Sequence, residues 1–374
     1  MEDFNPFILK NYINPTYFCD RNSELTKLIQ RFDNQRNTTL ASNRRMGKTG
    51  LIYHLFYHLT ERNQAIKCLY IDLYASQDLA NFIRLLSKEI AIKLYKKPNI
   101  IVSSFKNMFK SMAPVVTFDT QSGMPQIEFN FRNEEEKRQS LEDIFHYLKN
   151  QDVKIVIAFD EFQQIATYPE QNVEALLRTL TQNLHNVNFI FSGSQKHLLI
   201  QMFASAQRPF YQTTDFMYLN TIPAPDYKAF ISQKMLEGKK HIPEDTLDYI
   251  LQFTRIHTYY VQSVCNRLYH YPKKELRKEY AQEVTAAILE ENEDFYYSIR
   301  NLLPDYQWRL LQALAKEQGA DKLNSKDFIH THHLNTQGTV QRALAALLSK
   351  DMIFEEEGKY YVQDVFLSRW LERR

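Results

Sequence analysis

Glycine is scarce in this 374-residue chain, which has only 8 glycines, three cysteines and no long apolar run. Average glycine usage is roughly 7%, so two glycines in one loop are more informative here than in most chains. The three cysteines, Cys19, Cys68 and Cys265, are isolated from one another, which excludes a disulfide framework and a zinc-ligand spacing. Because no run reaches about 18 apolar residues, we do not expect a membrane-spanning helix.

An excess of one charge sign is also missing, since 46 Lys and Arg stand against 44 Asp and Glu and the net charge is +2. Such a balance gives no global basic field, so nucleic-acid binding would need a local patch. The first residues, Met1–Asn5, lack the basic and apolar regions of a signal peptide. We therefore expect a cytoplasmic protein with no membrane partner. Its length allows two or three domains.

The segment at 41–49, near the N-terminus, has the features of a phosphate-binding loop. It fits the Walker A pattern G-x-x-x-x-G-K-[ST] except at Ser42, where the first glycine belongs. A short strand is expected at 38–41 and a helix at 51–59. Backbone N–H groups and the helix N-terminus would then cradle phosphates, while Lys48 pairs with the β/γ-phosphates and Thr49 ligates Mg²⁺. Taken alone, the segment could equally be a surface loop before a helix. The candidate nucleotide contacts are Asn43, Arg44, Arg45, Met46, Gly47, Lys48, Thr49 and Gly50.

A continuous apolar run at 154–159 is followed by two acids, Asp160 and Glu161. Such a run is typical of a central parallel strand buried on both faces. Ligands of open α/β sheets bind beyond the carboxyl ends of the strands, which is where both acids would lie. This is the Walker B pattern, in which Asp160 would hold Mg²⁺ through its water shell and Glu161 would polarise the attacking water. The alternative, an acidic turn after a buried strand, loses weight once the upstream loop is considered.

Two more apolar runs, 68–73 and 187–195, predict neighbouring strands. A strand between the two motifs, with Glu directly after the Walker B Asp, is typical of the additional-strand, catalytic-glutamate (ASCE) branch of P-loop NTPases. The second run ends in small polar residues, where that branch places a sensor of the γ-phosphate. Ser194 is our candidate, with Ser192 and Gln195 as alternates. An ordinary strand-to-loop transition remains the other interpretation.

Together these segments resemble the AAA+/STAND-type ATPases typified by the archaeal ATPase family, including a bacterial set common in Bacteroidetes. The resemblance implies ATP and Mg²⁺ as cofactors, Arg21 as a further nucleotide contact and Arg208 as a trans-acting or sensor arginine. Arg208 could also be a solvated loop charge. The matching segments are the Arg21/Glu24 box, the loop ending Arg44-Arg45-Met46-Gly47-Lys48-Thr49, Phe159-Asp160-Glu161-Phe162, Phe191-Ser192-Gly193-Ser194, Arg208-Pro209-Phe210-Tyr211 and His257-Thr258-Tyr259-Tyr260-Val261-Gln262.

The last of these segments resembles a Gly-His-Pro-Tyr-Tyr-like lid motif that approaches the nucleotide. Ile256 and Thr258 stand at its Gly and Pro positions. The motif's usual nucleotide contact is therefore in doubt, and His257 and Tyr259 could instead be core residues.

We predict an α/β fold of the P-loop NTPase (AAA+/ASCE) type, a parallel-sheet sandwich with a helical lid and a C-terminal winged helix. The core would span 1–218, the lid 219–298 and the winged helix 299–374. Alternating apolar and polar residues around a Gly-containing loop predict a β-hairpin insertion at about 113–132. Its exposed face could bind a partner or be only a local flap. In the lid, helical spacing is clearest over 226–235, 244–253 and 259–269, and 283–297 would form a linking helix with an acidic patch.

The expected winged helix has an unusual charge pattern. Its recognition helix offers polar side chains with one positive charge, and the wing tip carries Glu355, Glu356 and Glu357. Because Lys and Arg contacts with phosphate supply most of the affinity for DNA, this tip should repel a duplex. DNA binding is therefore weakly supported, and a packing or protein-interaction role fits the charge better. The polar side chains are those of Thr336, Gln337, Thr339, Gln341 and Arg342.

Two functional hypotheses follow. The first is a Mg²⁺-dependent ATPase that binds ATP and ADP and acts as a molecular switch, with Glu161, Lys48, Ser194 and Arg208 as catalytic candidates and Thr49 and Asp160 at the metal. The second is a nucleotide-dependent DNA-binding or adaptor protein with little hydrolysis, which the serine in the loop and the altered lid motif favour. Both leave a protein partner or self-assembly open. Adenine specificity rests on the resemblance alone.

Overall fold

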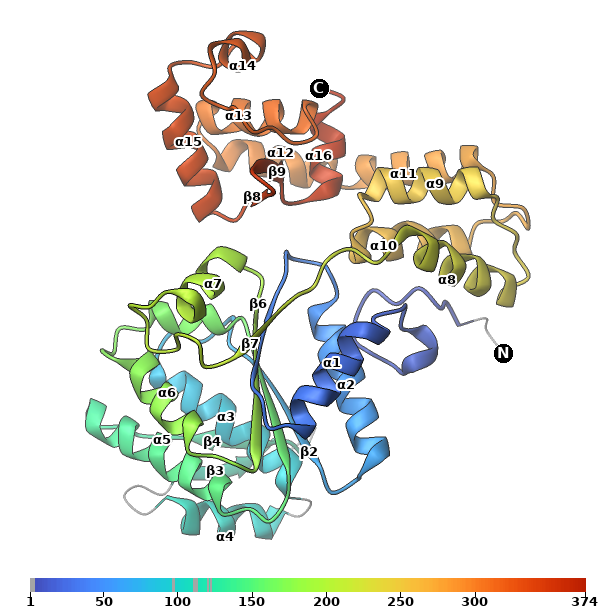
Figure 1. Cartoon of the computed structure of the whole chain (residues 1–374). Helices are drawn as coiled ribbons and strands as arrows, with labels where there is room; N and C mark the ends of the chain where they lie inside the picture. The colour runs from blue at the N-terminus through green and yellow to red at the C-terminus, as the bar shows by residue number, and fades with distance from the viewer. Residues whose placement is uncertain (1–3, 96–97, 110–113, 120, 122) are drawn as a thin grey trace. The chain divides into compact units, whose positions relative to one another are not determined.

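The computed structural model describes residues 4–95, 98–109, 114–119, 121 and 123–374. The chain divides into two compact units, which are treated separately (Figure 1). We call Arg21–Asn43 with Gly47–Asn220 the sheet unit. The helical unit consists of Met1–Asp20, Arg44–Met46 and Thr221–Arg374.

The sheet unit is built on five parallel strands in the order β2-β5-β6-β1-β7. β1 therefore lies between two strands that follow it in sequence by more than a hundred residues. The strands predicted at 38–41, 68–73 and 154–159 are present, and the run at 187–195 forms a strand that ends at Gly193, whereas the edge strand β7 was not predicted. The strands are β1 (Thr38–Ala41), β2 (Lys67–Asp72), β5 (Ile155–Asp160), β6 (Val187–Gly193) and β7 (Asp215–Tyr218).

Helices cover both faces of this sheet, which is why its strands β5 and β6 are buried throughout and mostly apolar. On β5, Ile155, Ile157 and Phe159 enter the aromatic core on the face of α3, α5, α6 and α7, whereas α1 and α2 lie on the opposite side (Figure 1). Phe159 stacks on Phe189 of β6 with ring centroids 6.2 Å apart. These helices are α1 (Asn22–Asp33), α2 (Lys48–Arg62), α3 (Leu79–Leu94), α5 (Glu134–Lys149), α6 (Val173–Gln182) and α7 (Lys196–Ala204).

Two details of the sheet unit bear on the sequence predictions. Helix α1 begins at Asn22, and its cap position is Arg21, with φ 68° and no side-chain cap bond. The Arg21 guanidinium is held by Glu24, at 2.9 Å.

The hairpin insertion is present as β3 (Val115–Phe118) and β4 (Pro125–Glu128), which pair antiparallel. Positions 113, 120 and 122 of the predicted hairpin lie outside the described residues. The remaining elements of this unit are α4 (Pro98–Met108) and the 3₁₀ segment η2 (Phe162–Thr167).

The helical unit contains the expected lid helices, with one difference. A single linking helix was predicted over 283–297, but the structure has two helices that meet at Asn292, where φ is −96° and ψ is 3°. The Asn292 side chain donates to the Ile288 carbonyl, 2.7 Å away. Asparagine favours such termini because its amide competes with the backbone for hydrogen bonds. Before α8 comes the short 3₁₀ segment η1 (Pro15–Tyr17). The helices are α8 (Ala224–Glu237), α9 (Glu244–Thr254), α10 (Thr258–Tyr269), α11 (Lys278–Glu291) and α12 (Glu293–Leu302).

The C-terminal part has the helices and the two-stranded wing that the sequence predicts. Three of its helices begin with a side-chain cap, from Ser325, Thr336 and Asp364. Such caps satisfy N–H groups that have no partner inside the helix. At the wing tip, Gly358 has φ 79°, which the tight turn requires. The elements are α13 (Asp305–Lys316), α14 (Lys326–Thr331), α15 (Gln337–Ser349), β8 (Ile353–Glu356), β9 (Lys359–Val362) and α16 (Val365–Leu371).

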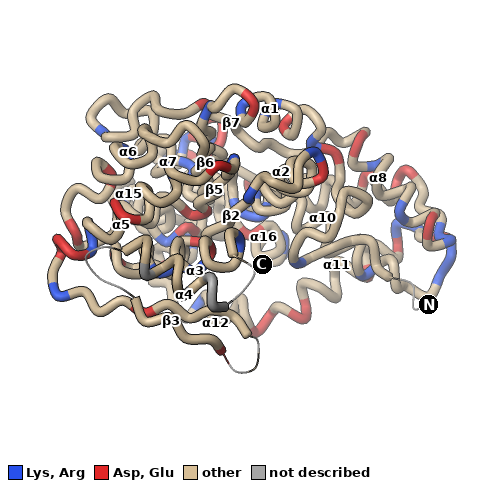
Figure 2. The backbone as a smooth tube through the Cα atoms, turned by 90° about the horizontal axis from the view of Figure 1, so that it is seen from below, with Lys and Arg blue, Asp and Glu red and all other residues tan. Residues whose placement is uncertain are grey.

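The numbers of basic and acidic residues are nearly equal, and residues of the two signs are mixed along the chain. Figure 2 shows basic and acidic residues interspersed along the tube. Among the residues that the structure describes, no helix is both long and apolar enough to span a bilayer.

Candidate nucleotide-binding site

Parallel pairing brings the predicted motif residues to one edge of the sheet. In the strand register, Asp160 at the end of β5 is paired with Asp72 of β2, and Gly193 at the end of β6 is paired with Ala41 of β1. The phosphate-binding loop starts directly after Ala41. Because the carboxyl ends of these strands coincide, the loop, the two acids and the polar end of β6 share the position at which open α/β sheets bind ligands.

Asp160 is the centre of a hydroxyl network. Its Oδ2 accepts hydrogen bonds from the Thr49 hydroxyl (3.1 Å) and the Tyr70 hydroxyl (2.5 Å). Its Oδ1 accepts from the Ser192 hydroxyl at 2.6 Å and from the backbone N–H of Glu161 at 3.1 Å. Asp160 is only 5% exposed, and these donors satisfy its buried charge. The network joins the two predicted metal residues, Thr49 and Asp160.

Glu161 is held in a conformation that few non-glycine residues adopt. Its φ is 52°, in the left-handed region, which costs on the order of 1–3 kcal/mol for a non-glycine residue. Its Oε2 accepts from the Ser194 backbone N–H (3.0 Å), the Ser194 hydroxyl (2.9 Å) and the Gln163 amide (2.6 Å). The carboxylate of the expected base is thus fixed by the expected sensor residue.

The backbone of the phosphate-binding loop explains how a serine replaces the first glycine. The left-handed residues of this loop are Arg45, with φ 65°, and Gly47, with φ 93°, whereas Ser42 has no positive φ. Ser42 is buried, and its hydroxyl donates to the Asn43 carbonyl at 2.9 Å. The substitution therefore introduces no strained conformation at position 42. Gly47 stands at the cap of α2, whose first residue is Lys48.

The middle of the same loop, Arg44–Met46, is grouped with the helical unit. There the Arg45 guanidinium donates to the Tyr260 hydroxyl at 2.6 Å and to Asp364 at 2.7 Å, and it lies 4.7 Å from the centre of the Tyr259 ring. The Tyr259 backbone N–H donates to the Arg45 carbonyl at 3.1 Å. Arg44 forms an ion pair with Asp351 at 2.7 Å. Both loop arginines therefore have carboxylate partners in this structure.

The altered lid motif begins helix α10. His257 is its cap residue and is buried, and burial together with the neighbouring Arg255 lowers the pKa of His257 to about 4. Tyr260 is buried, with its ring 4.7 Å from that of Phe366. His257 and Tyr260 are therefore core side chains of the helical unit, and Tyr259 contacts the loop through its backbone and ring.

Two of the predicted arginines have acidic partners. Arg21 is buried and paired with Glu24 within the sheet unit. Arg208 is ion-paired with Glu174 of α6. These pairs give each arginine a structural role in this state, and their predicted roles at the nucleotide remain predictions.

The predicted recognition surface of the winged helix has the charge that the sequence suggests. Arg342 of α15 makes long hydrogen bonds, both 3.4 Å, to Gly338 and Thr339 of its own helix. The wing-tip residues Glu355, Glu356 and Glu357 are exposed. An acidic wing opposes contact with the phosphates of a duplex.

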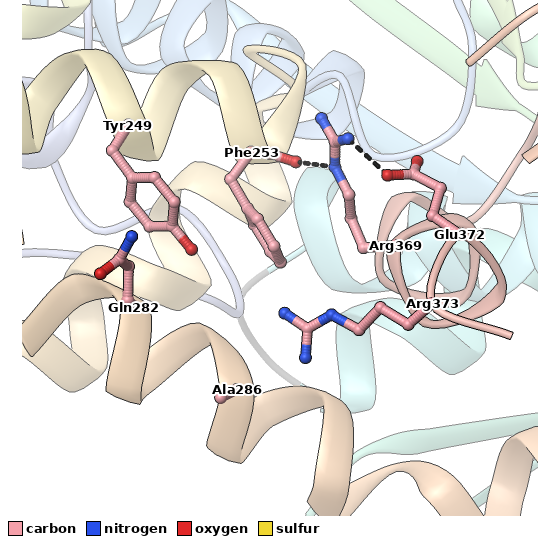
Figure 3. Close-up of a pocket in the computed structure, with 7 residues that line it drawn as sticks. All are labelled: Tyr249, Phe253, Gln282, Ala286, Arg369, Glu372 and Arg373. Atoms are coloured by element: carbon pink, nitrogen blue, oxygen red, sulfur yellow. Dashed lines mark hydrogen bonds and ion pairs between the residues drawn. The ribbon is translucent and has the colours of Figure 1, made fainter. Parts of the chain in front are cut away.

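A separate pocket of about 500 Å³ lies within the helical unit (Figure 3). Its principal cation, Arg369, is already bonded to the carbonyls of Phe253 (2.8 Å) and Gln252 (2.7 Å) and to Glu372 (2.8 Å). We therefore regard Arg369 as structural. The lining residues are Tyr249, Phe253, Gln282, Ala286, Arg369, Glu372 and Arg373.

Sequence reasoning missed two residues of the site, Tyr70 and Gln163. Tyr70 could have been found, because the alternation of side chains along a strand puts it on the same face as Asp72, two residues later. Gln163 had no such signal, since it lies in the irregular segment η2 and contacts Glu161 only because the chain turns there.

Comparison with known proteins agrees with this architecture. Residues 29–201 match the family described as an AAA domain, and residues 294–373 match a probable winged helix domain. No curated protein sequence matches the chain.

Several solved structures are similar in fold. The Walker-type ATPase PABY2304 of Pyrococcus abyssi is 19% identical with a TM-score of 0.66, over 98% of this chain and 99% of that one. The ORC2 protein of Aeropyrum pernix, solved as ADPNP–ADP complexes, is 13% identical with a TM-score of 0.60, over 100% and 96% of the two chains. The ORC1 protein of Aeropyrum pernix, solved in complex with DNA, is 12% identical with a TM-score of 0.53, over 96% and 94%. At these identities the likeness concerns the fold.

The parallel sheet, the phosphate-binding loop and the paired acids define a P-loop protein of the AAA class. More specifically, the chain contains an AAA domain of the P-loop type, matched over 29–201, and a C-terminal winged helix domain, matched over 294–373. The predicted fold class is thereby confirmed. The three predicted domain boundaries and the roles of individual site residues remain predictions.

Proposed function

We propose that this protein is a Mg²⁺-dependent ATPase in which nucleotide binding and hydrolysis change the arrangement of its domains. The observation that carries the proposal is the pair of adjacent carboxylates at the end of β5. Asp160 is bonded to the Thr49 hydroxyl of the phosphate-binding loop, and Glu161 is held by Ser194. Each acid therefore has the partner that its proposed role requires.

The residues present fit a magnesium ion. Mg²⁺ prefers oxygen ligands and is usually held by one or two carboxylates together with substrate phosphates and water. Asp160 and the Thr49 hydroxyl offer two oxygens 3.1 Å apart. When bound, the ion would neutralise charge on the phosphates. Among the described residues no cluster of three or more His, Cys, Asp or Glu side chains could hold a metal.

The remaining chemistry belongs to the chain itself. Lys48 and the N-terminus of α2 would bind the phosphates, because the first N–H groups of a helix carry partial positive charge. Glu161 would accept a hydrogen bond from the attacking water and orient it toward the γ-phosphate. Ser194 would keep that carboxylate in place. In this account catalysis consists of positioning and electrostatic stabilisation.

Phosphate release by the purified protein tests the assignment of the base. Glu161→Gln keeps the shape of the side chain, so it should retain ATP binding and lose turnover by a factor of about 10²–10⁴. Lys48→Ala is the companion variant and should lose binding. Undiminished hydrolysis by Glu161→Gln with intact binding would reject the role of Glu161.

The switch rests on the loop residues that pack with the helical unit. Arg45 contacts Tyr260 of α10 and Asp364 at the start of α16. Phosphates entering the loop would compete with Asp364 for this guanidinium, so binding of ATP should alter contacts inside the helical unit. Sedimentation with and without Mg-ATP would report such a change, and any self-assembly in which Arg208 acts on a neighbouring copy.

The alternative is a nucleotide-dependent DNA-binding or adaptor protein with little hydrolysis. The similarity in fold to an ORC1 protein solved in complex with DNA favours it, whereas the acidic wing tip opposes it. ATP binding without phosphate release above that of Lys48→Ala would support this alternative. Fluorescence anisotropy with a DNA duplex across a salt series would test the DNA contact, because affinity that depends on phosphate contacts falls steeply with salt.

A further inference from the structure

Tyr70 is a polar side chain of the site that none of the recognised motifs contains. It lies in β2, beside Ala158 of β5 in the strand register. Its hydroxyl donates to Oδ2 of Asp160 at 2.5 Å, and the same oxygen accepts from the Thr49 hydroxyl at 3.1 Å. The Tyr70 hydroxyl therefore donates to the same Asp160 oxygen as the hydroxyl of Thr49, which is a proposed metal ligand.

The position of this phenol is fixed from the side as well. The Tyr70 ring packs on the ring of Tyr53 from α2, with centroids 5.0 Å apart and planes inclined by 37°. The Tyr70 hydroxyl is the donor of its hydrogen bond with the Asp160 carboxylate.

The consequence for metal binding follows from which donor is free of the metal. A Thr49 hydroxyl that ligates Mg²⁺ does so through an oxygen lone pair and keeps its proton for Oδ2 of Asp160, so its position depends on the ion as well as on the carboxylate. Ser192 and the Glu161 N–H both bond the other oxygen, Oδ1. Tyr70 and Thr49 both donate to Oδ2, and of these two residues Tyr70 is the one that is not itself a proposed metal ligand.

We propose that Tyr70 is a positioning residue of the magnesium site, which orients the Asp160 carboxylate through its hydroxyl. This inference rests on the proposed function, since it requires that Mg-nucleotide binds at Asp160. Groups that orient metal-binding carboxylates typically contribute about 10- to 100-fold to metal affinity. Tyr70 should accordingly affect the metal and leave binding of the nucleotide without metal unchanged.

The test uses Tyr70→Phe in the full chain, in a Glu161→Gln background so that hydrolysis does not interfere. A fluorescent ATP analogue is titrated in EDTA, and then Mg²⁺ is titrated into the complex. We expect equal affinity in EDTA and a Mg²⁺ concentration for half-maximal effect that is about tenfold higher in Tyr70→Phe. Tyr53→Phe is the matched control, because it removes a phenol hydroxyl one ring away and keeps the ring contact; its Mg²⁺ dependence should equal that of the parent.

Two results would overturn the inference while leaving the proposed function intact. One is an unchanged Mg²⁺ dependence of Tyr70→Phe in a parent that binds Mg-nucleotide. The other is an equal loss of affinity with and without Mg²⁺, which would show a general structural role. A parent that binds no nucleotide would instead overturn the proposed function, and the inference with it.

Discussion

Ser194 donates two hydrogen bonds to one oxygen of Glu161, from its backbone N–H at 3.0 Å and from its hydroxyl at 2.9 Å. The residue at the end of β6 and the acid at the end of β5 are therefore a single unit before any ligand binds. A change in Ser194 should act through the orientation of the Glu161 carboxylate.

Ser194→Ala removes the hydroxyl bond and keeps the N–H bond. A hydrogen bond to a charged group contributes about 1.5 kcal/mol or more, so we expect turnover to fall about tenfold with little change in nucleotide affinity. Steady-state phosphate release and equilibrium binding of a fluorescent nucleotide measure the two effects. Ser205→Ala, at the half-buried C-cap of α7 outside the site, is the control. Full activity of Ser194→Ala would contradict the coupling.

Gly193 offers a second test of how the Glu161 carboxylate is held, through Gln163. A Cβ added to this glycine would lie 2.1 Å from Oε1 of Gln163. Because Gln163 is a flexible side chain, Gly193→Ala should fold with a thermal midpoint close to that of the parent. The displaced Gln163 would lose its 2.6 Å bond to Glu161, so turnover should fall.

Removing the Gln163 side chain provides the control for this prediction. Gly193→Ala combined with Gln163→Ala relieves the clash, so the double variant should be no less active than Gln163→Ala alone. If Gly193→Ala is fully active by itself, the packing of Gln163 against Gly193 does not matter to the site.

Comparison with the sequence prediction shows which interactions a single sequence can reveal. Lys48, Thr49, Asp160 and Glu161 were predictable because short motifs fix their spacing along the chain, and parallel strands bring those motifs to one edge. The bonds from Ser192 to Asp160 and from Ser194 to Glu161 depend on strand register, which sequence periodicity does not determine. The contact of Gln163 depends on an irregular turn. The break at Asn292 was missed because apolar spacing continues across it.

Acid should destabilise the helical unit through His257. Burial lowers the pKa of this histidine from 6.5 to about 4, so the unfolded chain binds its proton more tightly than the folded protein does. The stability of the folded state is therefore full above about pH 6.5 and falls as pH decreases toward 4, by at most about 3 kcal/mol from this group. His257→Gln should flatten the dependence of the unfolding free energy on pH in this window, as measured by urea denaturation.

His54 offers an internal comparison for that measurement. It lies in the sheet unit, and burial, with a smaller effect of His58, lowers its pKa to about 4 as well. His54→Gln should therefore remove a similar pH dependence from the sheet unit. A pH profile that neither substitution changes would show that other groups control the acid sensitivity.

Arg369 should stabilise the helical unit without affecting the nucleotide. Its guanidinium bonds the carbonyls of Gln252 and Phe253 at the end of α9, where helical carbonyls have no partner inside the helix. Arg369→Met retains much of the side-chain volume but removes one donor from each carbonyl and from Glu372. The backbone N–H of Arg255 still donates to the Gln252 carbonyl at 3.3 Å, and its guanidinium still donates to Glu372 at 3.2 Å. We expect a loss of about 2–3 kcal/mol in unfolding free energy, measured by chemical denaturation, with unchanged nucleotide affinity.

Arg373→Met is the matched control, since Arg373 lines the same pocket (Figure 3) but is exposed. Its effect should stay within about 0.5 kcal/mol. Equal effects of the two substitutions would show that the carbonyl bonds of Arg369 contribute nothing beyond its apolar contacts.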